Sequence, residues 1–154
     1  MTCEMKLKEK YFDMIKCGGK IYEIRLNDEK RWLIDVGDII VFKKESCLIE
    51  KINTIVKDII YFSSFEEMAS TLSLEKVGFL KERSEDVANI YHEFYTVEDE
   101  TKYGVVAIKV EKINKIGIFL YKKIKILSIW NLLWELTKAN KIFSKRFTFF
   151  CCMI

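Results

Sequence analysis

The spacing of apolar residues changes period several times along the first 112 residues, and each change predicts a new element. Within Lys8–Cys17, apolar side chains recur at helical spacing, and the glycine pair Gly18-Gly19 ends the pattern. The following segment, Ile21–Leu26, alternates, so that one face carries Tyr22, Ile24 and Leu26 and the other carries Ile21, Glu23 and Arg25. We therefore predict a helix, a tight turn and a half-buried strand.

Further strands follow a polar loop at Asn27–Arg31. The tripeptide Val36-Gly37-Asp38 predicts a turn into Ile39–Phe42, whose unbroken apolar run is typical of a strand buried on both faces. Residues Cys47–Ile60 are rich in β-branched side chains and predict either one long strand or two shorter ones. The strand Tyr103–Val110 completes this set.

Two helices are predicted between the long β-rich stretch and the last strand. Ser64 and Glu67 have the spacing of a capping box, which predicts a helix that continues to about Leu72. A second helix over Glu85–Phe94 carries its apolar side chains on one face, and Glu98–Glu100 is expected to be a solvated acidic loop. This order favours an α+β fold, a small mixed β-barrel of five to six strands with helices at its ends.

Residues 113–154 differ in kind from residues 1–112. Ser128 is a candidate N-cap for an amphipathic helix, and the chain ends in the apolar run Phe147–Ile154. The helix is predicted from apolar positions at i, i+3, i+4, i+7 spacing: Ile129, Leu132, Leu133, Leu136, Asn140 and Phe143. We expect a domain over 1–112 and a basic, aromatic extension over 113–154, helical or poorly ordered.

Charge is distributed unevenly between these two parts. Residues 1–112 contain 18 Lys/Arg and 22 Asp/Glu, a net −4, whereas residues 113–154 contain 8 Lys/Arg and 1 acid, a net +7; together they give the +3 of the whole chain. The extension therefore has three open interpretations. It is a helix that binds anionic membrane or nucleic acid, a helix that docks on the barrel or on a second copy, or a terminus unrelated to the domain's function, such as read-through of unspliced or frame-shifted coding sequence.

Cysteine and histidine usage argues against a familiar metal site. The five cysteines are scattered and form no CxxC pair, and the single histidine is His92. Structural zinc sites need closely spaced Cys and His ligands, so we expect no metal and no other cofactor. The N-terminus lacks the apolar stretch of a signal peptide, and no uncharged apolar run reaches the roughly 18 residues that a spanning helix needs, so a cytoplasmic location is expected.

The octapeptide Gly18-Gly19-Lys20-Ile21-Tyr22-Glu23-Ile24-Arg25 is the strongest candidate for a site. The glycines allow a tight turn and a close approach to a ligand. Lys20 follows that turn, and Glu23 and Arg25 lie at i, i+2 on one face of the predicted strand. An ammonium, a carboxylate and a guanidinium thus converge, which suits a base edge or a phosphate. The alternative is a same-face ion pair on a solvated sheet, worth less than about 1 kcal/mol.

This octapeptide resembles the GxKxxExR signature of the ASCH domain family, a PUA-like group. Four further segments resemble family landmarks in the same order: Tyr11–Lys16, Val36–Phe42, Ser64–Met68, and Tyr91–Tyr95 with Tyr103–Ile108. The resemblance implies a PUA-like barrel and a cleft lined by the octapeptide, with RNA or a modified nucleoside as partner. The ligand-binding residues that it implies are Gly18, Gly19, Lys20, Glu23 and Arg25.

The resemblance also raises a catalytic alternative. Some small bacterial family members hydrolyse the amide of N-acetylated cytidine with a lysine at the position of Lys20, a threonine at the position of Glu23 and a downstream glutamate. Here Glu23 replaces the threonine, and Glu66, Glu67 and Glu75 are the candidates for the downstream acid. Lys20 and Glu23 are therefore candidate catalytic residues for hydrolysis of modified nucleosides or RNA, and a non-catalytic RNA- or nucleotide-binding module is the first hypothesis.

Two residues with aromatic rings, Trp32 and His92, are further candidates outside the octapeptide. Trp32 follows Lys30-Arg31, so it is a candidate for stacking on a base beside two cations, and equally for closing one end of the barrel. His92 lies near the end of a predicted helix, where a surface or capping role is favoured over catalysis. The sequence leaves the oligomeric state open.

Overall fold

Ten elements follow one another in the first part of the chain. The computed structural model describes residues 2–114, 117, 119–121, 123–124 and 126–136. In order, the elements are β1 (Thr2–Leu7), α1 (Glu9–Cys17), β2 (Tyr22–Leu26), β3 (Ile39–Lys44), β4 (Cys47–Phe62), α2 (Phe65–Thr71), α3 (Leu74–Val77), α4 (Ser84–His92), α5 (Val97–Tyr103) and β5 (Val105–Lys112). The chain divides into two units, Met1–Ile113 and Asn114–Ile154, which are described separately.

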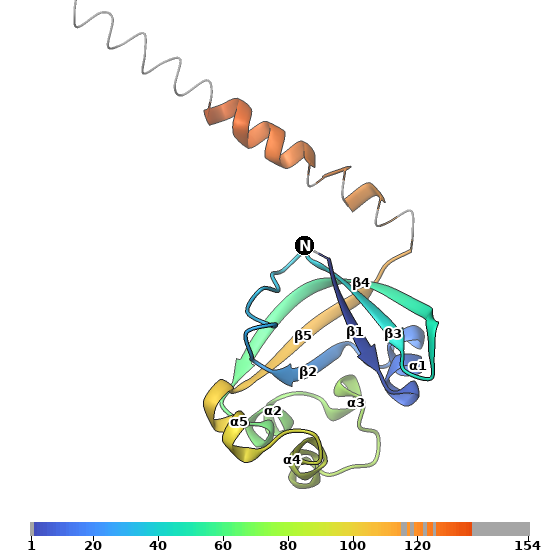
Figure 1. Cartoon of the computed structure of the whole chain (residues 1–154), viewed down its shortest axis with the longest axis vertical. Coiled ribbons are helices and arrows are strands. Elements are labelled where there is room, and N and C mark those ends of the chain that lie inside the picture. Colours follow the sequence, from blue (N-terminus) through green and yellow to red (C-terminus); the bar gives the residue numbers. More distant parts are fainter. Residues whose placement is uncertain (1, 115–116, 118, 122, 125, 137–154) are drawn as a thin grey trace, which may run out of the picture. The chain divides into compact units, whose positions relative to one another are not determined.

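The five strands form one curled mixed sheet in the order β1-β3-β4-β5-β2 (Figure 1). β1 runs parallel to β3, and the other neighbouring pairs are antiparallel. β4 is one long strand, and its pairing with β5 shifts register between Val56 and Asp58, where the sheet bends. The predicted mixed barrel is confirmed in the form of a half-barrel, with β1 and β2 as its two edges.

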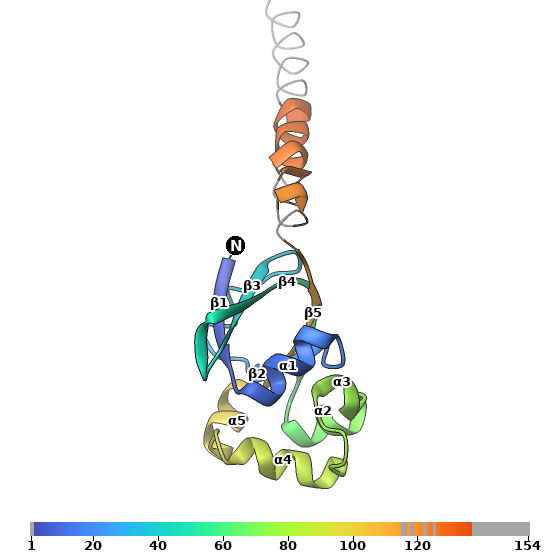
Figure 2. The same cartoon turned by 90° about the vertical axis from the view of Figure 1, so that its right-hand side faces the viewer.

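Each face of the curled sheet covers its own hydrophobic core. Along β5, Val106 and Ile108 face the interior of the half-barrel, where Phe12 and Ile15 of α1 join them. Val105 and Ala107 face the opposite side and pack with α2, α3 and α4. The helices α2 to α5 gather at one end of the sheet (Figures 1 and 2). The period-2 alternation of a strand is what allows one strand to serve two cores.

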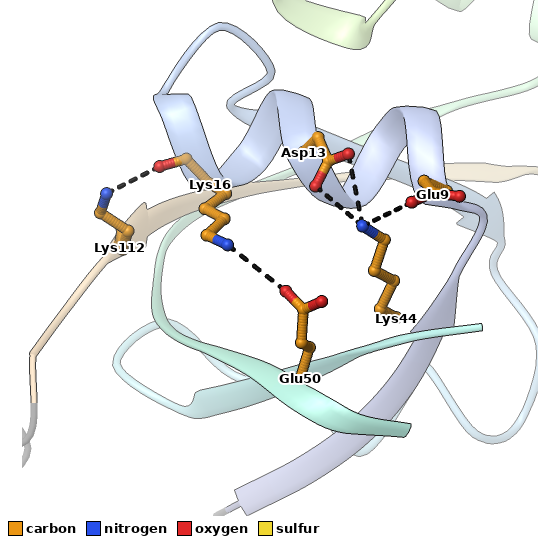
Figure 3. Close-up of polar contacts among 6 residues, drawn as sticks. All are labelled: Glu9, Asp13, Lys16, Lys44, Glu50 and Lys112. Carbon is orange, nitrogen blue, oxygen red and sulfur yellow. Dashed lines mark hydrogen bonds and ion pairs between the residues drawn. The ribbon is translucent and has the colours of Figure 1, made fainter. Parts of the chain in front are cut away.

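Helix α1 is held to the sheet by charged contacts along its exposed side (Figure 3). Lys44 of β3 reaches Glu9 Oε1 at 2.6 Å and Asp13 Oδ1 at 3.4 Å. Near the other end of the helix, Lys16 Nζ lies 3.3 Å from Glu50 Oε2, and Lys112 Nζ donates to the carbonyl of Lys16 at 2.7 Å. These contacts, together with the buried Phe12 and Ile15, fix the position of α1 on the sheet. They therefore also fix the position of the glycine pair that follows the helix.

The structure corrects three expectations for this first unit. β1 was not among the predicted strands, because its sequence reads as a charged N-terminus. The stretch Glu98–Glu100 is not a solvated loop but the first turn of α5, capped by Thr96, whose side chain accepts from Asp99 N. Glu100 is buried there, where it accepts from Phe65 N at 2.6 Å and lies 2.6 Å from Nε2 of His92. The predicted strand start at Tyr103 belongs instead to this helix.

The predicted capping box at Ser64 is confirmed with one change of partner. The Ser64 hydroxyl accepts from Glu67 N at 3.1 Å, as expected for an N-cap. The carboxylate of Glu67, however, accepts from Ser63 N at 2.7 Å and from the Ser63 hydroxyl at 2.6 Å, one residue earlier than the usual box. The Ser63 contacts hold the pKa of Glu67 below its ordinary value.

The second unit contains a C-terminal helix, as predicted, and its described residues 117, 119–121, 123–124 and 126–136 are all helical. Ser128 lies within this helix and is therefore not its N-cap. Its apolar side chains, including Ile129, Trp130 and Leu133, are each at least half exposed. Among the described residues, no helix is long and apolar enough to cross a membrane. The predicted positions Asn140 and Phe143, and the run Phe147–Ile154, lie outside the described residues.

Candidate ligand pocket at the open edge of the half-barrel

The glycine pair after α1 directs the chain into the candidate site. Gly18 adopts a left-handed φ of 87°, and its N–H donates to the carbonyl of Ile15 at 3.1 Å, which ends the helix. The next peptide groups are held as well: Lys20 N donates to Met14 O at 3.1 Å, and Ile21 N donates to Lys76 O at 2.9 Å. Lys20 is therefore fixed at its backbone before the strand begins.

Lys20 is buried, with 4% of its surface exposed. Its ammonium donates to the carbonyls of Tyr22 and Val77, both at 2.6 Å, and lies 3.3 Å from Glu23 Oε2. Burial lowers the pKa of Lys20 from its ordinary value, while the neighbouring Glu23 carboxylate opposes this change. An ammonium has three N–H bonds, and three oxygen acceptors surround this one.

Glu23 is the centre of the cluster. It is 3% exposed, and its other carboxylate oxygen, Oε1, lies 2.8 Å from Nη2 of Arg25. The guanidinium of Arg25 also donates from Nη1 to the hydroxyl of Tyr95 at 3.3 Å and from Nη2 to the carbonyl of Lys6 at 3.2 Å. Although burial lowers the pKa of Arg25, Glu23 and Tyr95 outweigh that effect and raise it, so the guanidinium stays charged.

These three side chains line one wall of a pocket of roughly 350 Å³ between β1, β2 and α4. The volume falls in the range of small-molecule sites, about 300–1,000 Å³. The opposite walls are aromatic and apolar, and they are formed by Tyr11, Phe79, Ile90, Tyr91, Phe94 and Tyr95. Burial, with a further contribution from Glu23, raises the pKa of Tyr91 well above its ordinary value, so this side chain remains a neutral phenol.

Gly78 makes room for the buried lysine. Its φ of 111° is in the region that favours glycine, and a Cβ here would lie 3.2 Å from Lys20 Cδ and 3.2 Å from Tyr11 Cδ1. The same turn presents the carbonyl of Val77 to the Lys20 ammonium. A residue 58 positions along the chain from Lys20 therefore shapes the site, and the octapeptide gives no sign of it.

The structure brings some predicted site residues together and leaves others apart. Lys20, Glu23 and Arg25 form one contiguous cluster, whereas Gly18 and Gly19 serve the turn and do not line the pocket. Trp32 is 61% exposed, its indole N–H donates to Asn27 O at 2.7 Å, and it is not among the pocket-lining residues. The candidate downstream acids also lie off the pocket lining: Glu66, Glu67 and Glu75.

Sequence reasoning missed the pocket's aromatic walls. Tyr91, Phe94 and Tyr95 all come from α4 and the residues that follow it, and in the sequence they appear only as the apolar face of a helix. Three aromatic residues within five positions are the one sequence signal that could have indicated this wall. Within the part of the chain that the structure describes, no group of three His, Cys, Asp or Glu side chains is arranged to hold a metal ion.

The half-barrel with its cleft at the strand edge places the protein in the PUA-like class. Comparison with sequence families is consistent with this, because the family model for the ASCH domain matches residues 5–114. The chain belongs to the ASCH domain family. Residues beyond 114 lie outside the match.

Two solved structures are similar over the same part of the chain. The crystal structure of the hypothetical protein PH0355 is 42% identical, with a TM-score of 0.66, and the match covers 73% of this chain and 100% of that one. The solution NMR structure of protein PF0455 from Pyrococcus furiosus is 38% identical, with a TM-score of 0.61, and the match covers 74% of this chain and 99% of that one. No curated protein matches this chain significantly.

Proposed function

We propose that this ASCH domain binds a nucleobase, as a modified nucleoside or as part of single-stranded RNA, in the pocket that Lys20, Glu23 and Arg25 line. The observation that carries the proposal is a buried carboxylate held between two cations, opposite aromatic walls. Sequence-specific RNA recognition commonly uses unstacked bases that contact aromatic rings and present their hydrogen-bonding edge to side chains.

The charge of the wall favours a base over a phosphate. Glu23 provides an acceptor for an exocyclic amino or ring N–H group, and Arg25 provides donors for a neighbouring carbonyl oxygen or ring nitrogen. A phosphate in the same place would meet cations, because Lys6, Lys8, Lys20 and Arg25 line the pocket, but it would also meet the carboxylates of Glu23 and Glu45. The aromatic side chains, by contrast, offer flat surfaces that suit a planar ligand.

The contacts of Lys20 favour binding over catalysis. A lysine that accepts a proton or attacks a carbonyl must first lose a proton, and here its three N–H bonds face three oxygen acceptors that stabilise the ammonium. Lys20 then acts on the ligand indirectly, because it fixes the carboxylate of Glu23. The catalytic alternative rests on the lowered pKa of Lys20, because a lower pKa increases the fraction of neutral amine at physiological pH.

A binding experiment on the full chain tests the proposal. We expect the protein to bind at least one of the four ribonucleosides, N4-acetylcytidine or a short single-stranded RNA, and calorimetry or NMR titration measures the affinity. Phe94→Ala removes a half-exposed aromatic wall with little risk to folding and should weaken binding at least about fivefold, given about 1–3 kcal/mol per stacked base. Tyr61→Ala, another exposed aromatic residue, off the pocket lining, is the matched control.

Glu23→Gln tests the polar wall in the same assay and should weaken binding by tenfold or more, provided that the variant retains the circular dichroism spectrum of the wild type. Equal affinities for wild type, Phe94→Ala and Glu23→Gln would refute the proposed site. Release of acetate from N4-acetylcytidine, lost in Lys20→Met, would replace the binding role by the hydrolase alternative.

A further inference from the structure

A second pocket adjoins the first one at Arg25. It has a volume of roughly 320 Å³ and is lined by Cys3, Glu4, Met5, Lys6, Arg25, Lys30 and Arg31. Lys6 and Arg25 line both pockets, and the hydrogen bond from Arg25 Nη2 to the carbonyl of Lys6 lies between them. The two pockets are therefore neighbours that share the Arg25 side chain.

The second pocket is a basic region in an acidic unit. Four of its seven lining residues are cations and one is an acid, a difference of +3, whereas residues 1–112 carry 18 cations and 22 acids, a difference of −4. The single acid, Glu4, is engaged by Lys43. Because the surrounding unit is net negative, this concentration of positive charge does not follow from composition.

Two of the four cations are available to a ligand. Arg25 and Arg31 are paired with Glu23 and Asp28, respectively. Lys6 and Lys30 are exposed, and neither makes an ion pair within the described part of the chain. In addition, Nε of Arg25 and Nε of Arg31 are buried without a hydrogen-bond partner among the described residues. A buried unpaired donor is unfavourable, so the packing of the two guanidinium groups is not fully satisfied by the protein's own acceptors.

We propose that the second pocket binds the phosphate group attached to the nucleotide whose base occupies the first pocket. The inference rests on the function proposed above and narrows its ligand class to nucleotides and RNA, in preference to free nucleosides. Lys6 and Lys30 supply point charges to the phosphate oxygens, and the two guanidinium groups supply directional donors. The carboxylates of Glu23 and Glu45 disfavour a phosphate in the first pocket, whereas the one carboxylate of the second pocket, Glu4, is already paired with Lys43. The two pockets thus divide the recognition of base and phosphate between them.

The test compares each of the four ribonucleosides with its 5′- and 3′-monophosphates and with a mixed-sequence pentaribonucleotide, on the full chain at one salt concentration. We expect at least one phosphorylated ligand to bind tenfold or more tightly than its nucleoside. In the double variant Lys6→Gln/Lys30→Gln, that preference should fall to about threefold or less. The readout is the ratio of nucleotide to nucleoside affinity within each protein, because Lys6 also lines the first pocket.

The control variant loses the same number of positive charges, at positions that line neither pocket. Lys16→Gln/Lys57→Gln removes two lysines that make exposed ion pairs with Glu50 and Glu111 and should retain the full preference for the phosphorylated ligand. Equal binding of nucleosides and nucleotides to wild type, or an unchanged preference in Lys6→Gln/Lys30→Gln, would overturn the inference. A loss of preference in both double variants would show a general charge effect and would overturn it too.

The outcome separates this inference from the proposed function. If nucleosides bind in a manner that depends on Phe94 and phosphate adds nothing, only the phosphate pocket is refuted. If binding of every ligand is insensitive to Phe94→Ala and Glu23→Gln, the base pocket itself is refuted, and the phosphate pocket loses its premise.

Discussion

The guanidinium of Arg25 donates to the carbonyl of Lys6 at 3.2 Å and so joins β2 to β1, the two edges of the curled sheet. No backbone ladder connects these strands among the residues that the structure describes. One side chain thus spans the open edge of the half-barrel at the position where both pockets meet.

Replacing Arg25 by alanine should therefore affect both binding and the mobility of β1. We expect Arg25→Ala to weaken ligand binding at least about tenfold, because hydrogen bonds to charged groups contribute about 1.5–3 kcal/mol. Amide hydrogen exchange in Thr2–Leu7 should accelerate as well. Arg83→Ala removes an arginine that is paired with Asp86 off the pocket lining and should change neither property. Unchanged exchange in β1 would show that the Arg25–Lys6 contact is not a structural link.

The buried pair of Lys20 and Glu23 should be strongly coupled in stability. Each single variant, Lys20→Met and Glu23→Gln, leaves a partner without its charge and should cost about 3–5 kcal/mol, or less where Arg25 compensates. The double variant should be more stable than the sum of the two losses predicts, by about 1 kcal/mol or more. Urea unfolding of the four proteins measures this coupling. Lys76→Met, at an exposed position of α3, is the control and should change stability by less than about 0.5 kcal/mol. Additive losses would contradict a direct interaction.

Alanine substitutions at Gly18 and Gly78 distinguish the effect of backbone strain on stability from the effect of pocket geometry on binding. Gly18 and Gly78 both have positive φ, but a Cβ at Gly18 meets nothing within 4 Å, whereas at Gly78 it meets Lys20 Cδ and the Tyr11 ring at 3.2 Å. Gly18→Ala should destabilise the protein by about 1–2 kcal/mol and leave affinity unchanged. Gly78→Ala should destabilise it further and weaken binding, because Lys20 or Tyr11 must move. Equal affinity of the two variants would mean that the Lys20 side chain tolerates displacement.

The cap of α2 should make stability depend on pH. The pKa of Glu67 is lowered from 4.5 in the folded protein by its bonds to Ser63. The folded state thus favours the ionised carboxylate, so the stabilisation is present above pH 4.5 and is lost as the pH falls through the lowered value. Glu67→Ala should melt below wild type at pH 6, and the gap should narrow towards pH 3.5. Glu66→Ala removes an exposed carboxylate of the same helical turn that does not contact Ser63 and is the matched control.

Truncation tests whether the extension contributes to the folded domain. A chain that ends at residue 114, where the family match ends, should melt within a few degrees of the full chain and be more soluble, because it lacks exposed apolar side chains such as Trp130 and Trp134. Roughly 1 kcal/mol shifts the melting temperature of a domain of this size by about 3–6 °C. A decrease of more than about 8 °C would show that these residues belong to the core of the domain.

Elements whose information is local could be predicted from the sequence. Helix α1, the strand over Tyr22–Leu26, the long strand β4 and the Ser64 cap each follow from a spacing or a cap within a few residues. β1 could not be predicted, because its charged sequence becomes a strand only through parallel pairing with β3, some 37 residues away. The helix α5 was missed for a related reason: three acidic residues resemble a solvated loop unless the buried partners of Glu100 are known.

In the candidate site, the strand period of two places Glu23 and Arg25 on one face after the glycine turn, so their proximity could be predicted from local spacing. The groups that these charges contact depend on packing between distant segments. The carbonyl of Val77 lies 57 residues from Lys20, and the hydroxyl of Tyr95 lies 70 residues from Arg25. Burial of Lys20 and Glu23 arises from this packing, and burial is what shifts the pKa of Lys20. Local spacing carries no information about such distant contacts, because they form only when the sheet curls and α4 closes over its open edge.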